Sequence, residues 1–345
     1  MKKTFMANKR LRLVVYLAVA IVVIVAPLML SPYMNFQLSM VAVFAVAILG
    51  LNIIMGYTGQ ISLGQSAFVG LGAYMTAYGV LSGWPIVVTF LLACLVPAAV
   101  GFLVALPAVR LRGHALAVVT LGLPIIALPL ARRFPDFTGG SNGKTVDWMN
   151  APAWSGLAVD QWRYYVIIII AAIFFLFARN LVTGRIGRAF TIVRENEAVA
   201  TSMGISSYRY KVLAFTISSL YGGAAGFLYL GAVQFTSPET SSFLVAINIL
   251  AAMVIGGSGS IAGSLIGGAF YVTVPFLAGQ VNSSQTAIFS GAALLIVLLI
   301  VPGGLVTVPR AIRQLLAKRT ARANARLNKE SGEVEGNSSA STSTP

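Results

Sequence analysis

Residues 86–106 read Ile-Val-Val-Thr-Phe-Leu-Leu-Ala-Cys-Leu-Val-Pro-Ala-Ala-Val-Gly-Phe-Leu-Val-Ala-Leu, a stretch that carries no charged side chain. At 1.5 Å of rise per residue, a helix of about 20 such residues crosses the hydrocarbon core of a bilayer. Similar apolar runs lie at 13–30, 36–55, 62–81, 114–131, 163–178, 211–233, 243–255, 261–278 and 286–301. The sequence therefore predicts an all-α, polytopic membrane helix bundle of about ten transmembrane segments.

The overall composition supports a membrane protein and excludes several kinds of site. Of the 345 residues, 57% are hydrophobic and 10% are charged, whereas an average soluble domain is about 25% charged. The mean hydropathy is +0.85. Cys94 is the single cysteine and His114 the single histidine, too few for a zinc, iron–sulfur or haem site or for a disulfide framework. We therefore expect no metal site in this chain.

The distribution of basic residues predicts the orientation. The basic N-terminus precedes an apolar run that is longer than the core of a signal peptide, so we expect a retained first helix with its N-terminus inside. Loops that then lie inside hold the basic residues Arg110, Arg112, Arg179, Arg185, Arg188, Arg194, Arg310, Arg313, Lys318, Arg319, Arg322, Arg326 and Lys329. Outer loops hold only Arg132, Arg133, Lys144 and Arg163. The positive-inside rule places both termini in the cytoplasm, and the net charge of +15 needs no nucleic acid to explain it.

We expect a transmembrane domain over residues 1–317, with an outer loop at about 132–162 and an inner loop at about 184–209. The outer loop mixes acidic, basic and aromatic residues, and two interpretations stay open: a docking surface or a solvated connector. Residues 318–345 are polar and contain no aromatic side chain. They cannot bury enough surface to offset the entropy of ordering, so we expect a disordered cytoplasmic tail.

The absence of charges within the predicted spans weighs against an ion-coupled pump. Between Val212 and Pro309 the only charged residue is Glu239, in a predicted outer loop, whereas ion pathways commonly carry ionisable groups inside the membrane. The nearest approach to a phosphate-binding loop, Thr138–Thr145, has threonine where that motif needs its first glycine. We expect no catalysis and no bound nucleotide in this chain, so energy for active transport would enter from another subunit.

The inner loop contains a predicted short helix over about 195–203. Glu195 and Glu197 suit the first turn of a helix, and Gly204 suits its C-terminal end. Val199 and Met203 are four residues apart and share one face, which predicts apolar knobs for a groove on a partner. The alternative is a surface helix that rests on its own bundle. The candidate coupling residues are Arg194, Glu195, Asn196, Glu197, Ala198, Val199, Met203 and Gly204.

This loop resembles the cytoplasmic coupling loop of ABC importer permeases. The stretch from Gly184 to Ile205 carries Arg-Glu-Asn-Glu-Ala-x-Ala followed by glycine, and it is most similar to the permease subunits of branched-chain amino acid importers. Further motifs follow in the order of that family, at 56–68, 111–121, 138–141, 210–215, 254–263 and 302–305. Two positions depart from the family pattern: His114 replaces an aromatic residue, and Glu197-Ala198-Val199-Ala200 replaces Glu-x-Ala-Ala.

The resemblance implies an ABC importer permease architecture in the bacterial inner (cytoplasmic) membrane. It implies an importer made of this chain, a second homologous permease, two ATP-binding cassette subunits and an external substrate-binding protein. ATP and Mg²⁺ would bind in the partner subunits and not in this chain. The substrate implied is a branched-chain or related hydrophobic amino acid.

Two glycine-rich interruptions, Gly56–Gly64 and Gly256–Gly263, lie in the two halves of the chain. Such a pair predicts broken helices around a translocation path, because exposed backbone at membrane depth is tolerated where it lines a cavity. The alternative is close helix packing or plain turns. The candidate path residues are Asn52, Gly56, Gln60, Ser62, Gln65, Ser66, Gly256, Gly257, Ser258 and Ser260. Gly222-x-x-x-Gly226 and Gly263-x-x-x-Gly267 are expected to be packing faces.

The function predicted is therefore the transmembrane subunit of an ATP-driven importer. Permeases of the same family architecture for urea, short amides or aromatic acids remain alternatives. A second alternative is an ATP-independent facilitator or channel, which explains the uncharged spans but not the coupling-loop pattern. The paired glycine breaks disfavour a purely structural scaffold.

Overall fold

The computed structural model describes residues 23–111, 114–281, 291–292, 296, 299 and 304–307. Most of the predicted span at 286–301 and most of the span at 13–30 lie outside the described residues. The same holds for the predicted tail at 318–345 and for parts of the family motifs at 111–121 and 302–305.

The described residues form a helix bundle, as predicted. Its main helices are α2 (Pro32–Asn52) with a π-helical turn η1 (Ile53–Tyr57), α3 (Gln65–Leu81), α4 (Ile86–Ala108), α5 (His114–Arg133), α7 (Val159–Thr183), α10 (Ser207–Val233), α11 (Phe243–Gly256) and α12 (Ile261–Val281). Six helical segments, those of α2–η1, α4, α5, α7, α10 and α12, are long and apolar enough to cross a membrane. Helices α3 and α11 have only 17 and 14 residues. The membrane bundle is confirmed, whereas the described part of the chain does not establish ten spans.

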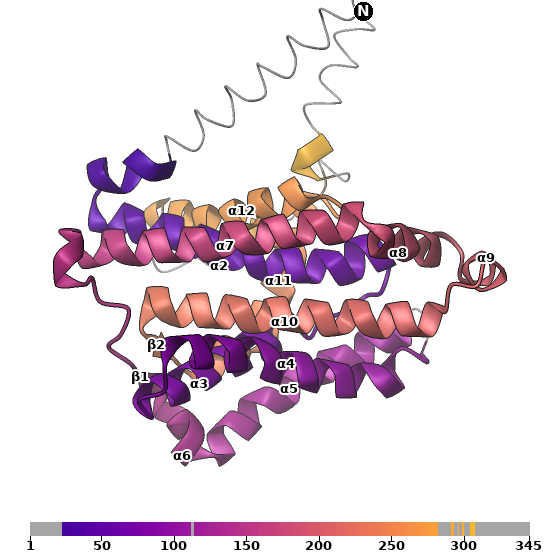
Figure 1. The fold of residues 1–345 in the computed structure, drawn as a ribbon, viewed down its shortest axis with the longest axis horizontal. Coiled ribbons are helices and arrows are strands. Elements are labelled where there is room, and N and C mark those ends of the chain that lie inside the picture. The colour runs from indigo at the N-terminus through magenta and orange to yellow at the C-terminus, as the bar shows by residue number, and fades with distance from the viewer. Residues whose placement is uncertain are drawn as a thin grey trace, which may run out of the picture.

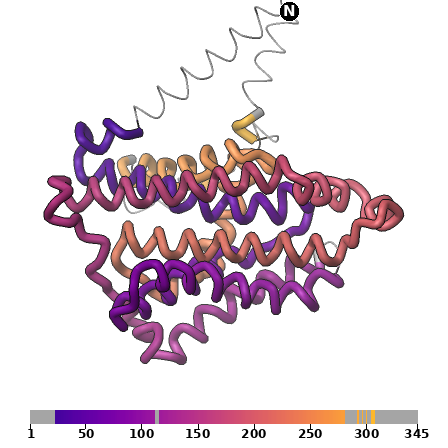
Figure 2. Tube along the Cα trace, in the orientation of Figure 1, coloured from indigo at the N-terminus to yellow at the C-terminus, as the bar shows by residue number. Residues whose placement is uncertain are grey.

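Helices α2 and α10 form the centre of the bundle. In the most apolar 18-residue stretch of α2 and η1, 78% of the residues are buried, and in that of α10, 72% are buried. Helix α10 packs on α3 and α4, and α2 packs on α7 and α12 (Figures 1 and 2). Glycines allow the close approach: a Cβ on Gly226 would lie 2.1 Å from the carbonyl oxygen of Val69, and one on Gly267 would lie 2.5 Å from that of Ala252. Both predicted packing faces are confirmed.

The two predicted loops lie at opposite ends of the long axis (Figure 1). The loop predicted to lie inside forms α8 (Arg185–Glu195) and α9 (Glu197–Ser202). At the other end lie α6 (Pro135–Thr138), η2 (Gly140–Asn142), η3 (Ala153–Ser155) and the antiparallel strands β1 (Lys144–Thr145) and β2 (Phe235–Thr236). Trp148 is buried there and its Nε1 donates to the Leu230 carbonyl at 3.3 Å, while Trp154 is 81% exposed. This loop is therefore partly packed onto α10 rather than a plain connector.

After α10 the chain folds back into the bundle before α11 begins. The short helix η4 (Pro238–Ser241) leads into α11. The hydroxyl of Ser66 donates to the carbonyls of Ser241 at 3.2 Å and Ser242 at 3.0 Å. Because Ser66 lies in the first turn of α3, α11 begins in the interior of the bundle. Its 14 residues then run only to the second glycine break.

Candidate coupling site and solute path

Helix α9 begins with a side-chain cap. Asn196 Oδ1 accepts from the backbone N–H groups of Ala198 at 2.9 Å and Val199 at 3.2 Å, which satisfies donors that the first turn of a helix leaves unpaired. Gly204 follows the helix with φ +77°, a conformation that favours glycine. The short helix is thus confirmed, although Glu195 ends α8 and only Glu197 lies in the first turn of α9.

One face of α9 is apolar and uncovered. Val199 is 49% exposed and Met203 is 64% exposed, whereas Ala200 is fully buried against the bundle. The helix therefore rests on its own bundle through Ala200 and presents the two larger side chains outward. An apolar surface of this kind on a short helix is suited to a groove in another protein.

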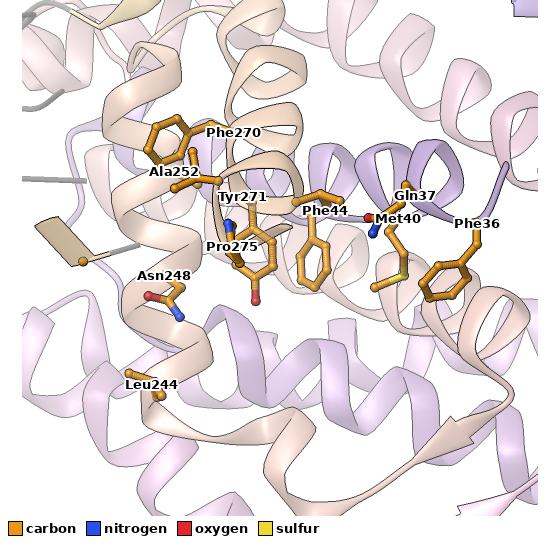
Figure 3. A pocket seen from close by; sticks show the side chains of 13 residues that line it. Phe36, Gln37, Met40, Phe44, Leu244, Asn248, Ala252, Phe270, Tyr271 and Pro275 are labelled. Carbon is orange, nitrogen blue, oxygen red and sulfur yellow. The ribbon is translucent and has the colours of Figure 1, made fainter. Parts of the chain in front are cut away.

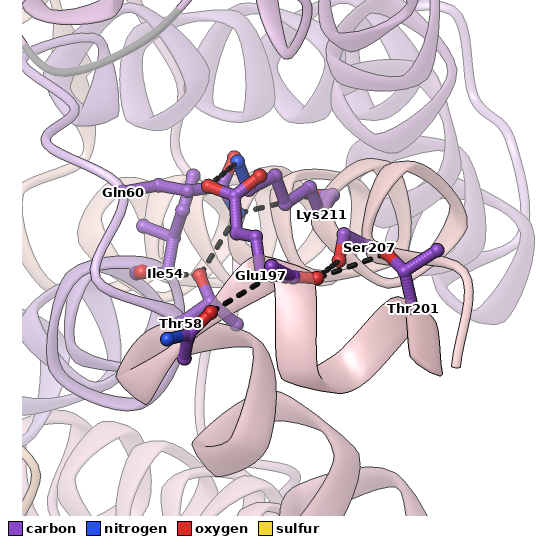
Figure 4. Close-up of polar contacts among 9 residues, drawn as sticks. Ile54, Thr58, Gln60, Glu197, Thr201, Ser207 and Lys211 are labelled. Atoms are coloured by element: carbon purple, nitrogen blue, oxygen red, sulfur yellow. Dashed lines mark hydrogen bonds and ion pairs between the residues drawn. The ribbon is translucent and has the colours of Figure 1, made fainter. Parts of the chain in front are cut away.

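An ion pair ties α9 to the start of α10 (Figure 4). Lys211 Nζ donates to Glu197 Oε1. Gln60 Nε2 donates to the Lys211 carbonyl at 3.3 Å and to Thr58 Oγ1 at 2.8 Å, and Thr58 in turn donates to the Ile54 carbonyl. Lys211 thus contacts α9 through its ammonium group and the loop that follows α2 through its backbone carbonyl. Lys211 was not among the candidate coupling residues; a lone lysine at the start of an apolar run was the signal that could have identified it.

The last turn of α8 contacts the first glycine break. Arg194 Nη1 donates to the Gly56 carbonyl. A Cβ on Gly59 would lie 2.9 Å from Arg194 Cγ, so the side chain also lies directly against this backbone. The candidate coupling residue Arg194 and the candidate path residue Gly56 therefore belong to one contact.

The two glycine breaks are joined through Asn52. Its Oδ1 accepts from the Gly259 N–H at 2.7 Å, and its Nδ2 donates to the Ser260 carbonyl at 2.8 Å and to Ser264 Oγ at 3.0 Å. Gly56 also lies against Gly259, since a Cβ on Gly56 would be 2.4 Å from the Gly259 nitrogen. Breaks that are distant in sequence thus meet in space.

Most polar side chains of the predicted path are buried and bonded within the protein. Gln65 Nε2 donates to the Ala47 carbonyl at 3.0 Å, and its Oε1 accepts from Ser218 Oγ at 3.1 Å. The buried members are Asn52, Gln60, Ser62, Gln65 and Ser66. Gly256 and Gly257 are also buried, Ser260 is half-buried and Ser258 is exposed. None of these residues lines either of the two cavities described next.

A cavity of about 520 Å³ lies between α2, α11 and α12 (Figure 3). Its walls are mostly apolar and aromatic, and Phe44 and Tyr271 stack in it with ring centroids 3.8 Å apart. Asn248 of α11 brings an amide into the cavity. That amide forms no hydrogen bond with any residue that the structure describes. A single asparagine in the apolar run 243–255 was the sequence signal for this site.

A second cavity, of about 380 Å³, lies between α3, α4, α5 and α6. It is lined by α3 residues such as Leu71 and Tyr74 and by α5 residues such as Ala127. Beside it, Arg132 at the end of α5 donates to Glu239 of η4 at 3.0 Å. The pKa of the Glu239 carboxyl is lowered by a hydrogen bond from its own backbone N–H and by Arg132.

Comparison with known proteins gives the family. The profile of the family described as branched-chain amino acid transport system / permease component matches residues 33–301. The chain is 33% identical over 274 residues to the high-affinity branched-chain amino acid transport system permease protein LivM of Salmonella typhimurium, an alignment that covers 71% of this chain and 63% of that protein. The chain thus spans less than two thirds of the length of this relative.

Two further relatives align over most of their own length. The autoinducer 2 import system permease protein LsrC of Enterobacter sp. is 28% identical, with 79% of each chain covered. The high-affinity branched-chain amino acid transport system permease protein LivH of Escherichia coli is 24% identical, with 77% of this chain and 92% of that protein covered. Since the family profile spans most of the described bundle, the chain belongs to the family of branched-chain amino acid transport system permease components.

Proposed function

We propose that this chain is a permease subunit of an ATP-driven importer for branched-chain or related hydrophobic amino acids. It would form the translocation path with a second homologous permease, and an external binding protein would deliver the solute. LivM and LivH, both named as permease proteins of a branched-chain amino acid transport system, support a pairing of two such chains. LsrC supports wider substrate use within the family, so other small solutes form the second candidate.

Helix α9 would receive the movement of an ATP-binding cassette subunit, in which ATP and Mg²⁺ bind. The single observation that carries this proposal is the anchored but uncovered state of α9. Its outer face exposes Val199 and Met203. Its inner side is fixed by Glu197 to Lys211, while the adjoining Arg194 holds Gly56. A partner that seats on the exposed face would therefore move the first glycine break and the start of α10.

The solute would pass along the cavity beside α11. Its volume of about 520 Å³ lies within the range of small-molecule sites, and mostly apolar walls with few polar groups are typical of them. Aliphatic side chains suit the apolar wall, and the amide of Asn248, which bonds to none of the described residues, suits a polar backbone group of the solute. Because the described lining of the cavity carries no charged group, it would bind the solute weakly and allow it to pass through.

The test is reconstitution. We would tag the chain, purify it in mild detergent with its native partners and identify these by mass spectrometry. We would then place the complex in liposomes with internal ATP and measure uptake of labelled leucine delivered by the co-purified binding protein. ATP-dependent uptake supports the importer. Uptake by the purified chain alone, without ATP, would instead establish the facilitator alternative.

A further inference from the structure

Asn52 lies at the point where the two glycine breaks meet, and its side chain bonds to Gly259 and Ser260 of the second break and to Ser264 just after it. We propose that Asn52 is a positioning residue that makes the two breaks move as one unit when α8 and α9 are displaced. This inference rests on the proposed function. It assigns to Asn52 a role in transmitting movement, rather than contact with the solute.

Both the oxygen and the nitrogen of the Asn52 amide form hydrogen bonds. Oδ1 accepts from Gly259, and Nδ2 donates to Ser260 and Ser264. The Asn52 side chain is fully buried, and its partners Gly259 and Ser260 are half-buried. Separating the breaks would leave the Gly259 N–H and the Asn52 amide unpaired in the interior, which is unfavourable.

Steric contact reinforces this connection. A Cβ on Gly56 would lie 2.0 Å from Asn52 Oδ1 and 2.4 Å from the Gly259 nitrogen. The two backbones therefore touch without an intervening side chain. Gly259 adopts φ +74°, a conformation that side chains disfavour. The contact between the two breaks is therefore too close to admit a side chain at Gly56.

The contact between the two glycine breaks is linked on one side to α8 and on the other to the helices that line the 520 Å³ cavity. Arg194 at the end of α8 donates to the carbonyl of Gly56. On the far side, Gly256 ends α11 and Ile261 begins α12. Both of these helices line the 520 Å³ cavity, so a displacement of Arg194 would reach two of its walls through the contacts that Gly56 and Asn52 make with Gly259.

The test separates this role from simple packing by measuring uptake and ATP hydrolysis on the same reconstituted complex. Asn52→Leu keeps a similar volume but removes all three hydrogen bonds. We expect uptake per ATP hydrolysed to fall about tenfold. We expect the hydrolysis rate of the complex to stay within about twofold of wild type, because the nucleotide sites lie in other subunits. Ser39→Ala is the matched control, since Ser39 also lies buried in α2 but bonds within its own helix, to the Asn35 carbonyl.

A milder variant covers the case in which Asn52→Leu does not assemble. Ser264→Ala removes one partner of Asn52 and should lower uptake per ATP about two- to threefold. If uptake and hydrolysis fall together in proportion to the amount of assembled complex, Asn52 has only a packing role and the inference is overturned. The same holds if the Asn52 and Ser264 variants match Ser39→Ala. Loss of ATP-dependent uptake in the wild type would instead overturn the proposed function itself.

Discussion

Lys211 of α10 and Glu197 of α9 form an ion pair in which the lysine is the more buried partner: its side chain is 11% exposed and that of the glutamate 45%. Glu197→Gln would leave a nearly buried ammonium group without a carboxylate. We expect this to weaken the attachment of α9 by about 1–3 kcal/mol and to lower transport. The measurement is ATP-dependent uptake by the reconstituted complex, normalised to correctly inserted protein.

Charge reversal sharpens this prediction. Glu197→Lys places two cations together and should uncouple uptake more strongly than Glu197→Gln. The double variant Glu197→Lys, Lys211→Glu restores opposite charges and should recover part of the activity, which a double-mutant cycle would measure. Normal uptake by a correctly inserted Glu197→Lys protein would contradict the coupling role of this pair.

The exposed face of α9 is expected to carry the affinity for an ATP-binding cassette subunit. Val199→Asp or Met203→Asp should each weaken binding of that subunit about tenfold or more, because truncating or charging a central apolar contact costs over about 1 kcal/mol. The measurement is the dissociation constant of the isolated ATPase subunit for the permease in nanodiscs. Trp154→Asp is the control, since Trp154 is 81% exposed at the opposite end of the molecule. An equal loss of affinity in the Val199, Met203 and Trp154 variants would contradict the prediction.

Helix positions were predictable wherever one apolar run lay between polar ends. The run 86–106 corresponds to α4, and the inner-loop helix was placed within about two residues. The run 243–255 also corresponds to a short helix, α11 (Phe243–Gly256), but this helix starts inside the bundle. Sequence could not show this, because the start of α11 is fixed by contacts with Ser66, 175 residues away. Composition within a run carries no information about such long-range contacts.

The polar residues of the candidate site were also identifiable, but their orientation was not. Asn52 and Gln65 stand out in sequence as amides among apolar residues, a pattern that fits both a solute path and an internal hydrogen-bond network. The structure pairs Gln65 with Ser218 of α10 and Asn52 with the second glycine break. Hydrophobic periodicity does not distinguish these cases, because both place the amide on an interior helix face.

The lowered pKa of Glu239, caused first by the hydrogen bond from its own backbone N–H and then by Arg132, predicts a modest pH dependence of stability. The pKa of Glu239 is lowered from its ordinary value of 4.5 in the folded protein. Its contribution is therefore present above that ordinary value and is lost as the pH falls through the lower folded value. Since both side chains are exposed, we expect no more than about 1 kcal/mol. Thermal unfolding of wild type and Glu239→Gln should differ at neutral pH and converge as the pH falls through the lowered pKa of the folded protein; a constant difference would refute the assignment.

The cavity beside α11 should control which solute passes. Ala252→Phe fills it from α11, and we expect uptake of leucine to fall about tenfold while uptake of the smaller alanine falls less, because bulk excludes the larger side chain first. Asn248→Leu removes the amide from the cavity and should raise the KM for transport about fivefold with little change in the maximal rate, since a lost hydrogen bond weakens solute binding by about 1 kcal/mol.

The matched control for this prediction is Ala127→Phe, which places the same bulk in the 380 Å³ cavity between α3 and α5. Because that cavity is proposed to lie off the path, its filling should leave the ratio of leucine to alanine uptake unchanged. If Ala127→Phe changes this ratio and Ala252→Phe does not, the solute passes between α3 and α5 instead. Equal loss of both solutes in both variants would indicate a general packing defect, and neither cavity would then select the substrate.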